Sequence, residues 1–301
     1  MQVETGIKSI NVGGRLLELS RPLVMGVLNV TPDSFHSASR VSSSEIGEAA
    51  ARMVADGADI LDIGACSTRP GADMPTASEE MSRLLPALEA VRERCPEAVI
   101  SIDTFRASVA RECVGDFGAD IINDISGGDM DPEMWSAVAD MGVPYVLMHT
   151  RGEPSTMTRL TDYADVTAEV LRDLARKTDA LRQLGVCDVI VDPGFGFAKT
   201  LEQNYELLAN LRAFEVIGAP ILVGMSRKKM IQRAVGEEAG SDGALYGTLA
   251  AHTLAMANGA DIIRVHDVRA AAAAAKVFAQ YRRAIPATSN QIVTQDFSPL
   301  I

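Results

Sequence analysis

The chain has 301 residues, of which 47% are apolar, 23% are charged and only 5% are aromatic. This composition supplies a sizeable core of small aliphatic side chains, which is typical of α/β proteins whose parallel strands are buried on both faces. The formal net charge of −12 argues against nonspecific binding to nucleic acid, which needs a basic face, so an anionic substrate would require a local cluster of cations.

Short apolar runs alternate with longer amphipathic segments along the chain. Before the first run, residues 7–19 predict a hairpin that turns at Gly13 and Gly14 and caps the bottom of the domain. Runs rich in Val, Ile and Leu predict buried strands near residues 23–28, 59–63, 99–102, 120–123, 144–148, 188–191, 220–224 and 261–265. Helical periodicity predicts helices over residues 44–56, 78–94, 108–117, 132–141, 165–184, 201–212, 243–258 and 269–282.

Eight strands that alternate with eight helices favour an α/β fold of the (β/α)8 TIM barrel type, which typically takes ~250 residues. We expect one domain over residues 1–301, in which residues 1–20 form a short N-terminal β-hairpin and residues 287–301 form a tail. A doubly wound open sheet is the structural alternative. No G-x-G-x-x-G pattern follows the first strand, however, and no change in composition divides the chain.

The cysteines and the apolar runs indicate where the protein works. The four cysteines, at positions 66, 95, 113 and 187, form no C-x-x-C pair, so a disulfide framework or a zinc site is not expected. No apolar run approaches the ~20 residues that span a bilayer. The first residues, 1–4, lack the pattern of a secretory signal. We therefore expect a cytoplasmic protein with no membrane partner.

Polar or glycine-rich segments follow each predicted strand. The first strand, for example, leads into Asn29-Val-Thr-Pro-Asp-Ser-Phe35, and the second into Asp62 and residues 64–71. A single Asp or Asn after a strand more often caps a helix or forms a turn than it binds a ligand. The coincidence of eight such ends on one rim of a barrel, where active sites of this fold lie, favours a binding site.

Four of these strand-end residues suit a flat heterocycle. Asp103, Asn123 and Asp192 are rich in acceptors and match ring N–H and amino donors. Lys228 can donate back to a ring carbonyl or a ring nitrogen. The group therefore predicts a heterocycle deep in the barrel.

A second group suits phosphate. Thr68, Arg69, Arg264 and His266 offer the guanidinium forks and hydroxyls that bind phosphate oxygens. Asn29 stands beside them and can offer its carbonyl oxygen to Mg²⁺, which prefers oxygen ligands and often keeps several waters. The sequence thus predicts a phosphate-bearing ligand with Mg²⁺ as cofactor.

These motifs, in this order, resemble the dihydropteroate synthase family of pterin-binding TIM barrels, from about Val24 to Val268. The segments that carry the resemblance are GVLNVTPDSF (26–35), STRPGA (67–72), SIDT (101–104), INDIS (122–126), LMH (147–149), DPGFGFAK (192–199), SRK (226–228) and RVHD (264–267).

The resemblance implies a reaction of folate biosynthesis, in which 6-hydroxymethyl-7,8-dihydropterin diphosphate condenses with p-aminobenzoate to give 7,8-dihydropteroate and pyrophosphate. In this mechanism diphosphate leaves first and the arylamine attacks a pterin methylene cation, which Asp103 is placed to stabilise. The family also implies a homodimer, formed through the helices over residues 243–258 and 269–282, and a sulfonamide target.

The roles of individual residues follow from the same resemblance. The pterin would be held by Asp103, Asn123, Asp192 and Lys228, in a slot shaped by Met148, Phe197 and Gly224. The diphosphate and Mg²⁺ would be held by Asn29, Thr68, Arg69, Arg264 and His266. The p-aminobenzoate would be covered by the first two loops with Phe35, Thr68 and Pro70. The residues expected to act in catalysis are Asp103, Lys228, Arg264 and His266.

Three departures from the family pattern concern the second substrate. Residues 36–40 read His-Ser-Ala-Ser-Arg where many relatives have an Asp-Gly-Gly stretch, which predicts a stiffer loop. Cys66 stands where a Glu is usual. Lys229 stands where a Ser commonly meets the p-aminobenzoate carboxylate, and its ammonium either pairs with that carboxylate or points to solvent.

Two other functions fit part of the pattern. A methyltransferase that moves a methyl group from a folate to a corrinoid would share the pterin-binding acids but would not need the phosphate group. A catalytically silent pterin-binding barrel with a structural or regulatory role is the other alternative, and the presence of both groups of residues argues against it. Release of pyrophosphate that depends on p-aminobenzoate excludes both.

Overall fold

Eight parallel strands form one sheet within the residues that the computed structural model describes, which are 8–30, 43–66 and 74–285. In sheet order these strands are β8 (Val189–Asp192), β7 (Tyr145–Met148), β6 (Ile121–Asp124), β5 (Val99–Asp103), β4 (Ile60–Gly64), β3 (Leu23–Asn29), β10 (Ile262–Val265) and β9 (Leu222–Val223). A parallel bridge between Val191 and Ile221 joins the two ends of the sheet. The strands therefore close into a (β/α)8 TIM barrel, as predicted, and the open-sheet alternative is wrong.

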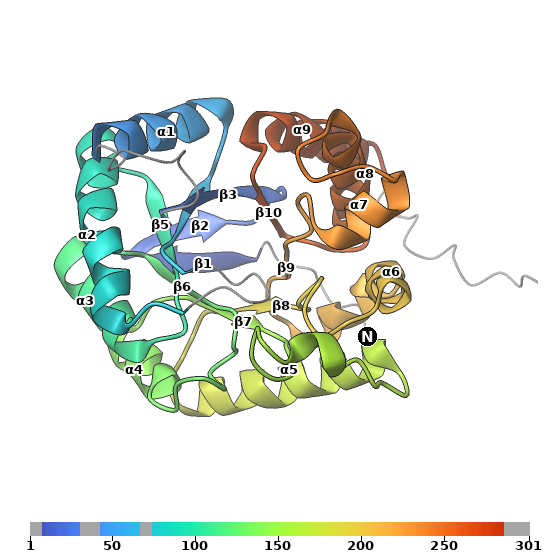
Figure 1. Cartoon of the computed structure of the whole chain (residues 1–301), viewed down its shortest axis with the longest axis horizontal. Helices are drawn as coiled ribbons and strands as arrows, with labels where there is room; N and C mark the ends of the chain where they lie inside the picture. Colours follow the sequence, from blue (N-terminus) through green and yellow to red (C-terminus); the bar gives the residue numbers. More distant parts are fainter. Residues whose placement is uncertain (1–7, 31–42, 67–73, 286–301) are drawn as a thin grey trace, which may run out of the picture.

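Helices surround the strands as an outer ring (Figure 1). They are α1 (Ser43–Asp56), α2 (Ala77–Arg94), α3 (Ala107–Phe117), α4 (Met134–Met141), α5 (Val166–Gln183), α6 (Leu201–Ala209), α7 (Lys229–Val235), α8 (Asp242–Ala257) and α9 (Val268–Ala284), with 3₁₀ turns η1 (Met157–Arg159) and η2 (Leu211–Ile217). None of the helices in the described residues is long and apolar enough to cross a membrane.

Local sequence signals set many of the helix ends. Thr76 and Thr200 begin α2 and α6 with capping boxes, in which Glu79 and Gln203 bind back to the cap residue. Gly118 ends α3 in the left-handed conformation, at φ +60°, that glycine adopts without strain. These signals explain why the predicted helix boundaries lie close to the observed ones.

Two elements differ from the prediction around the seventh strand. β9 has only two residues instead of the predicted five, and the short helix α7 that follows is not among the predicted helices. Seven residues are too few for apolar periodicity to stand out. The helix predicted over residues 201–212 ends at Ala209 and continues as the 3₁₀ turn η2. The predicted tail, residues 287–301, lies outside the described residues.

The hairpin closes the bottom of the barrel, as expected. Strands β1 (Ser9–Val12) and β2 (Arg15–Glu18) pair antiparallel around Gly13 and Gly14. Ile10, Val12 and Leu19 are buried against the first inward-facing layer of the barrel. That layer, the apolar floor, comprises Leu23, Met25, Ile60, Val99, Ile121, Val146, Ile190, Leu222 and Ile262.

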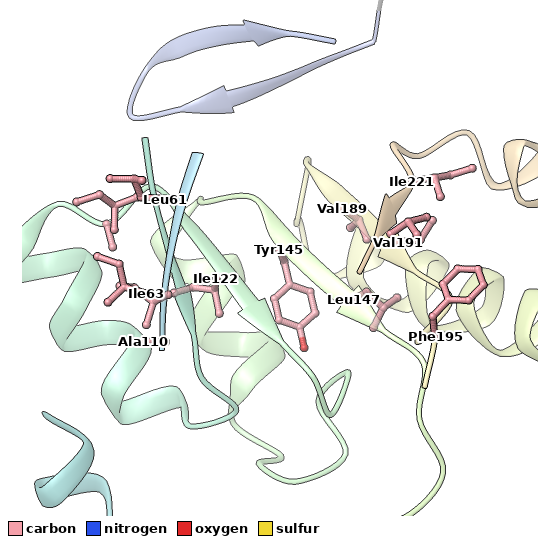
Figure 2. Close-up of a cluster of buried hydrophobic side chains, with 14 of the residues drawn as sticks. Leu61, Ile63, Ala110, Ile122, Tyr145, Leu147, Val189, Val191, Phe195 and Ile221 are labelled. Atoms are coloured by element: carbon pink, nitrogen blue, oxygen red, sulfur yellow. The ribbon is translucent and has the colours of Figure 1, made fainter. Parts of the chain in front are cut away.

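The opposite faces of the strands carry the larger core. Successive side chains of a strand point to opposite faces, so the neighbours of the inward residues pack outward against the helices. Figure 2 shows part of this cluster, including Leu61 and Ile63 of β4 and Tyr145 and Leu147 of β7. This core is apolar, and the polar residues of the strands belong mostly to the inward face.

Candidate active site

A polar layer lies directly above the apolar floor, toward the carboxyl ends of the strands. Each member follows a floor residue by two or four positions, so it faces the same interior about 7–13 Å further along the strand. The members are Asp62, Ser101, Asp103, Asn123, Asp192 and Arg264.

Arg264 joins two of these carboxylates. Its Nε donates to Asp62 Oδ2 at 2.6 Å, and its Nη2 donates to Asp103 Oδ2 at 2.6 Å. Asp62 is fully buried and also accepts hydrogen bonds from Ser101 Oγ at 2.6 Å and Asn123 Nδ2 at 3.1 Å. Because Asp62 is saturated, it fixes Arg264 and Asn123 in place.

The environment changes the protonation of Asp103. Desolvation raises the pKa of this carboxyl above its ordinary value, although the Arg264 cation opposes the shift. Two nearby carboxylates, Asp62 and Glu80, add to the rise. The group therefore takes up a proton at higher pH than an ordinary aspartate does.

Asp62 is a residue that the predicted site set omits. It appears in the sequence only as the polar end of the second strand, where a capping or turn role is the commoner interpretation. The signal that identifies it is register, since Asp62 pairs with Ser101 across β4 and β5. An inward-facing acid in such a position requires a buried partner, and Arg264 is that partner.

Asp192 and Lys228 meet at the turn after β8. Asp192 is buried, and its Oδ1 accepts a hydrogen bond from the Gly194 amide at 2.7 Å. Lys228 Nζ donates to the Phe195 carbonyl at 2.5 Å and lies 4.4 Å from the centre of the Phe197 ring. Desolvation lowers the pKa of Lys228 to about 8, although the Asp192 charge acts in the opposite direction.

Met148 and Gly224 border the same space. Met148 is buried at the end of β7 and stands opposite Asp192 in the strand register. Gly224 follows β9, and a Cβ atom built there would lie 3.7 Å from the Arg264 Cβ. The structure thus brings together the seven residues expected to form the heterocycle slot, and it adds Arg264 to them.

His266 lies at the rim of the barrel, directly after the end of β10 and two residues after Arg264. Its side chain is exposed, and its Nδ1 lies 3.1 Å from Ser226 Oγ. The neighbouring Arg227 is not available to a ligand, because all three of its guanidinium nitrogens are used. Its Nε and Nη2 donate to Asp267 at 2.7 and 2.9 Å, and its Nη1 donates to the carbonyls of Ala239 and Ser241. His266 and Lys229, which is exposed as the first residue of α7, remain at the mouth.

Part of the predicted phosphate group cannot be placed. Thr68, Arg69 and Pro70, like Phe35 and the His36–Arg40 segment, lie outside the described residues. Asn29 is half-buried at the end of β3, where it stands opposite Gly64 in the register. Within the described segments, no three His, Cys, Asp or Glu side chains cluster as a metal site.

Cys66 lies beside Arg106 and Glu80 and carries a thiol whose pKa is raised. Desolvation and the Glu80 carboxylate raise the pKa of its thiol to about 12, so the thiol is un-ionised at neutral pH. Arg106 Nη1 approaches the sulfur at 3.6 Å and also pairs with buried Glu80. All four cysteines of the chain are free.

Comparisons with known proteins agree with this geometry. The family model described as "Pterin binding enzyme" matches residues 25–266. A dihydropteroate synthase of Synechocystis sp. is 44% identical over 260 residues, which cover 85% of this chain and 89% of that protein.

Solved structures of relatives superpose over nearly the whole chain. A Xanthomonas albilineans dihydropteroate synthase with 4-aminobenzoic acid is 38% identical, with a TM-score of 0.84 over 93% of this chain and 100% of that one. The same enzyme in complex with 7,8-dihydropteroate is 37% identical, with a TM-score of 0.81 over 93% of this chain and 100% of that one.

Proposed function

The chain belongs to the dihydropteroate synthase family of pterin-binding enzymes, and we propose that it condenses 6-hydroxymethyl-7,8-dihydropterin diphosphate with p-aminobenzoate. The products are 7,8-dihydropteroate and pyrophosphate, so the enzyme is a transferase of folate biosynthesis. The observation that carries this assignment is the polar layer, whose Asp103, Asn123 and Asp192 face the interior above a closed apolar floor, with Lys228 held at the turn after Asp192.

The polar layer suits the pterin ring. Asn123 and Asp192 are almost fully buried, and the Asn123 side-chain oxygen and Asp192 Oδ2 have no protein donor among the described residues, so both can accept from a ligand that enters the barrel. Asp192 uses Oδ1 for the Gly194 amide and keeps Oδ2 for the ring. Lys228 supplies a donor from the opposite side. We assign Met148, Phe197 and Gly224 to the walls of the slot that holds this flat ring.

The proposed chemistry depends on a negative charge that the folded protein already holds in position. Loss of diphosphate leaves positive charge on the pterin methylene, and the Asp103 carboxylate offers a fixed negative charge to it. Arg264 holds Asp103 through one nitrogen, so the carboxylate does not need to reorganise during the reaction. The arylamine of p-aminobenzoate then attacks the methylene carbon. A nucleophilic side chain is not required.

The diphosphate end would lie at the mouth. We assign Asn29, Thr68, Arg69, Arg264 and His266 to the diphosphate, with His266 and Arg264 acting on the leaving group. The donor set fits Mg²⁺ as a metal held largely by the substrate. Asn29 can contribute one carbonyl oxygen, whereas Asp62 and Asp103 are already paired with Arg264. Bound there, Mg²⁺ would neutralise charge that develops on the leaving diphosphate.

The second substrate would approach over the same rim. We assign Phe35, Thr68 and Pro70 to its cover and Lys229 to its carboxylate. The position of Lys229, exposed at the start of α7 and next to Lys228, supports this role. The helix start adds the positive end of its dipole to the lysine charge.

A coupled assay tests the proposed reaction. Purified protein is incubated with the pterin diphosphate, Mg²⁺ and p-aminobenzoate, and pyrophosphate release is followed together with dihydropteroate formation. Release that depends on p-aminobenzoate is expected. Pterin binding without release would instead favour the silent barrel, and methyl transfer from methyltetrahydrofolate to a corrinoid would favour the methyltransferase.

We also propose a homodimer that forms through α8 and α9. Four large apolar residues are exposed on these adjacent helices, Tyr246 (65%) and Leu254 (56%) on α8 and Val277 (71%) and Tyr281 (60%) on α9. Exposed apolar side chains on two helices that pack against each other support an interface there. Sedimentation of the Leu254→Glu variant is expected to show a monomer. The free cysteines support a cytoplasmic location.

A further inference from the structure

The turn after β8 has an unusual backbone. Gly194, Gly196 and Ala198 all adopt positive φ angles, +73°, +81° and +47°. A Cβ atom on Gly194 would lie 1.9 Å from the His149 carbonyl oxygen, and one on Gly196 would lie 2.9 Å from Lys228 Cδ. The turn is therefore wedged between the end of β7 and the Lys228 side chain, and its conformation requires support from its surroundings.

Lys199 supplies that support from inside the turn. Its Nζ donates to the carbonyls of Gly194 at 3.0 Å and Phe197 at 3.1 Å, and it lies 3.2 Å from His149 Nδ1. Desolvation and the lysine charge lower the pKa of His149 to about 2, so the ring is neutral, and the tautomer with its proton on Nε2 accepts the third bond at Nδ1. Desolvation also lowers the pKa of Lys199 to about 7, and in the ammonium form all three of its protons are used within the protein.

The same turn presents three groups to the pterin slot. The Gly194 amide orients Asp192, the Phe195 carbonyl accepts from Lys228, and the Phe197 ring lies against the Lys228 ammonium. A shift of the turn would move all three together. Lys199 itself reaches no inward-facing residue of the polar layer by a hydrogen bond.

We propose that Lys199 is a positioning residue for the pterin substrate, which locks the turn at residues 194–198 and so sets the places of Asp192, Phe197 and Lys228. This inference rests on the proposed function, since it names the pterin as the group that the turn serves. A purely structural lysine would affect the stability of the fold but not the discrimination between the two substrates.

The test compares two lysine-to-methionine variants. Lys199→Met removes the ammonium inside the turn, whereas the control Lys8→Met removes one that pairs with Asp261 at the hairpin end, at 2.8 Å. For Lys199→Met we expect the KM for the pterin diphosphate to rise about 10- to 100-fold. The KM for p-aminobenzoate should stay within about twofold, because it does not depend on the turn.

The control should lower the melting temperature and leave both KM values unchanged. The proposal is overturned if Lys199→Met loses stability while both KM values stay as in the wild type, or if both rise equally. If Lys199→Met does not fold, Asn204→Ala removes a separate tether, the 2.6 Å bond to the Gly196 amide, and should raise the pterin KM selectively. An unchanged pterin KM in Asn204→Ala overturns the proposal in that case.

A measurement without turnover separates this inference from the proposed function. Amide hydrogen exchange at Gly194 and Gly196 should be at least tenfold faster in Lys199→Met than in the wild type. Unchanged exchange rates overturn the proposal that Lys199 fixes the turn, even if the enzyme is active. Conversely, a wild type that releases no pyrophosphate overturns the proposed function, whatever the exchange rates are.

Discussion

The two ends of the barrel interior are built from the same strands. The side chains are apolar at one end and polar at the other, and the change occurs within two residues along each strand. The apolar floor has Ile60, Ile121, Ile190 and Ile262 as members, and the hairpin covers it from below. Two positions further on, each of these strands carries a polar residue of the layer above: Asp62, Asn123, Asp192 and Arg264.

This difference shows how one scaffold divides stability from function. The floor is packed on every side and requires no ligand, so its side chains only stabilise the fold. In the polar layer, the charges are paired within the protein, and some of them keep an atom for which the structure shows no protein partner among the residues it describes. Asp192, for example, binds the Gly194 amide through one oxygen only. Substitutions on the two sides of this boundary should therefore have different consequences.

The largest effect is expected from Asp103→Asn. The amide keeps the shape of the side chain but removes the charge offered to the pterin methylene, so kcat should fall about 10²- to 10³-fold. Pterin binding should remain measurable by calorimetry. The matched control is Asp188→Asn, at the hairpin end of β8, where the carboxylate accepts only the Asn11 amide; its kcat should stay unchanged. A normal kcat for Asp103→Asn would refute the assigned role.

The pH profile of kcat/KM for the pterin diphosphate should give the next largest effect. The pKa of Lys228 is lowered from 10.5 to about 8, so the free enzyme loses this donor above pH 8 and kcat/KM should fall about tenfold per pH unit there. On the acidic side, the pKa of Asp103 is raised above the ~3.9 of an ordinary aspartate. As the pH falls, Asp103 therefore loses its negative charge at a higher pH than an ordinary aspartate does, and kcat/KM should fall with it.

A Lys228→Arg variant tests whether Lys228 causes the fall in kcat/KM above pH 8. Arginine stays charged throughout this range, so the limb near pH 8 should disappear at whatever activity remains. The stability of the wild type should rise over the pH range in which its activity falls. Between pH 8 and 10.5 the unfolded chain still holds the Lys228 proton that the folded protein has released, so the free energy of unfolding increases with pH. A basic limb that persists in Lys228→Arg would rule out Lys228 as its source.

A smaller effect is expected on the other side of the boundary. Ile60→Val removes one methylene group from the apolar floor and should lower the free energy of unfolding by about 0.5–1.5 kcal/mol. Because no ligand reaches this layer, kcat and both KM values should stay unchanged at 25 °C. Urea denaturation and steady-state kinetics on the same preparation would check both statements. A selective change in pterin KM would show that floor and polar layer are coupled.

The smallest effect concerns the rim. Lys229→Ala removes an exposed ammonium, and exposed ion pairs contribute about 0.2–1 kcal/mol. If Lys229 meets the p-aminobenzoate carboxylate, its loss should raise that KM about two- to fivefold and leave the pterin KM unchanged. The effect should shrink in high salt. An unaltered KM would assign the side chain to solvent.

The sequence was sufficient for the barrel because strands and helix ends depend on short-range patterns. Short runs of Val, Ile and Leu predict the strands, capping residues predict the helix ends, and the polar residues follow directly after the runs. α7 and the length of β9 escaped because a seven-residue helix and a two-residue strand carry little periodicity. Asp62 escaped because a lone acid after a strand looks like a cap.

Sequence alone therefore determined the order of strands and helices, and that polar residues follow the strands at one rim of the barrel. Only the tertiary structure decided the partners. Arg264 meets Asp62 and Asp103, which lie 202 and 161 residues away in the chain, and Lys199 turns inward to bind the carbonyls of its own turn. Periodicity fixes the direction of a side chain, whereas closure of the barrel fixes what that side chain meets across the interior.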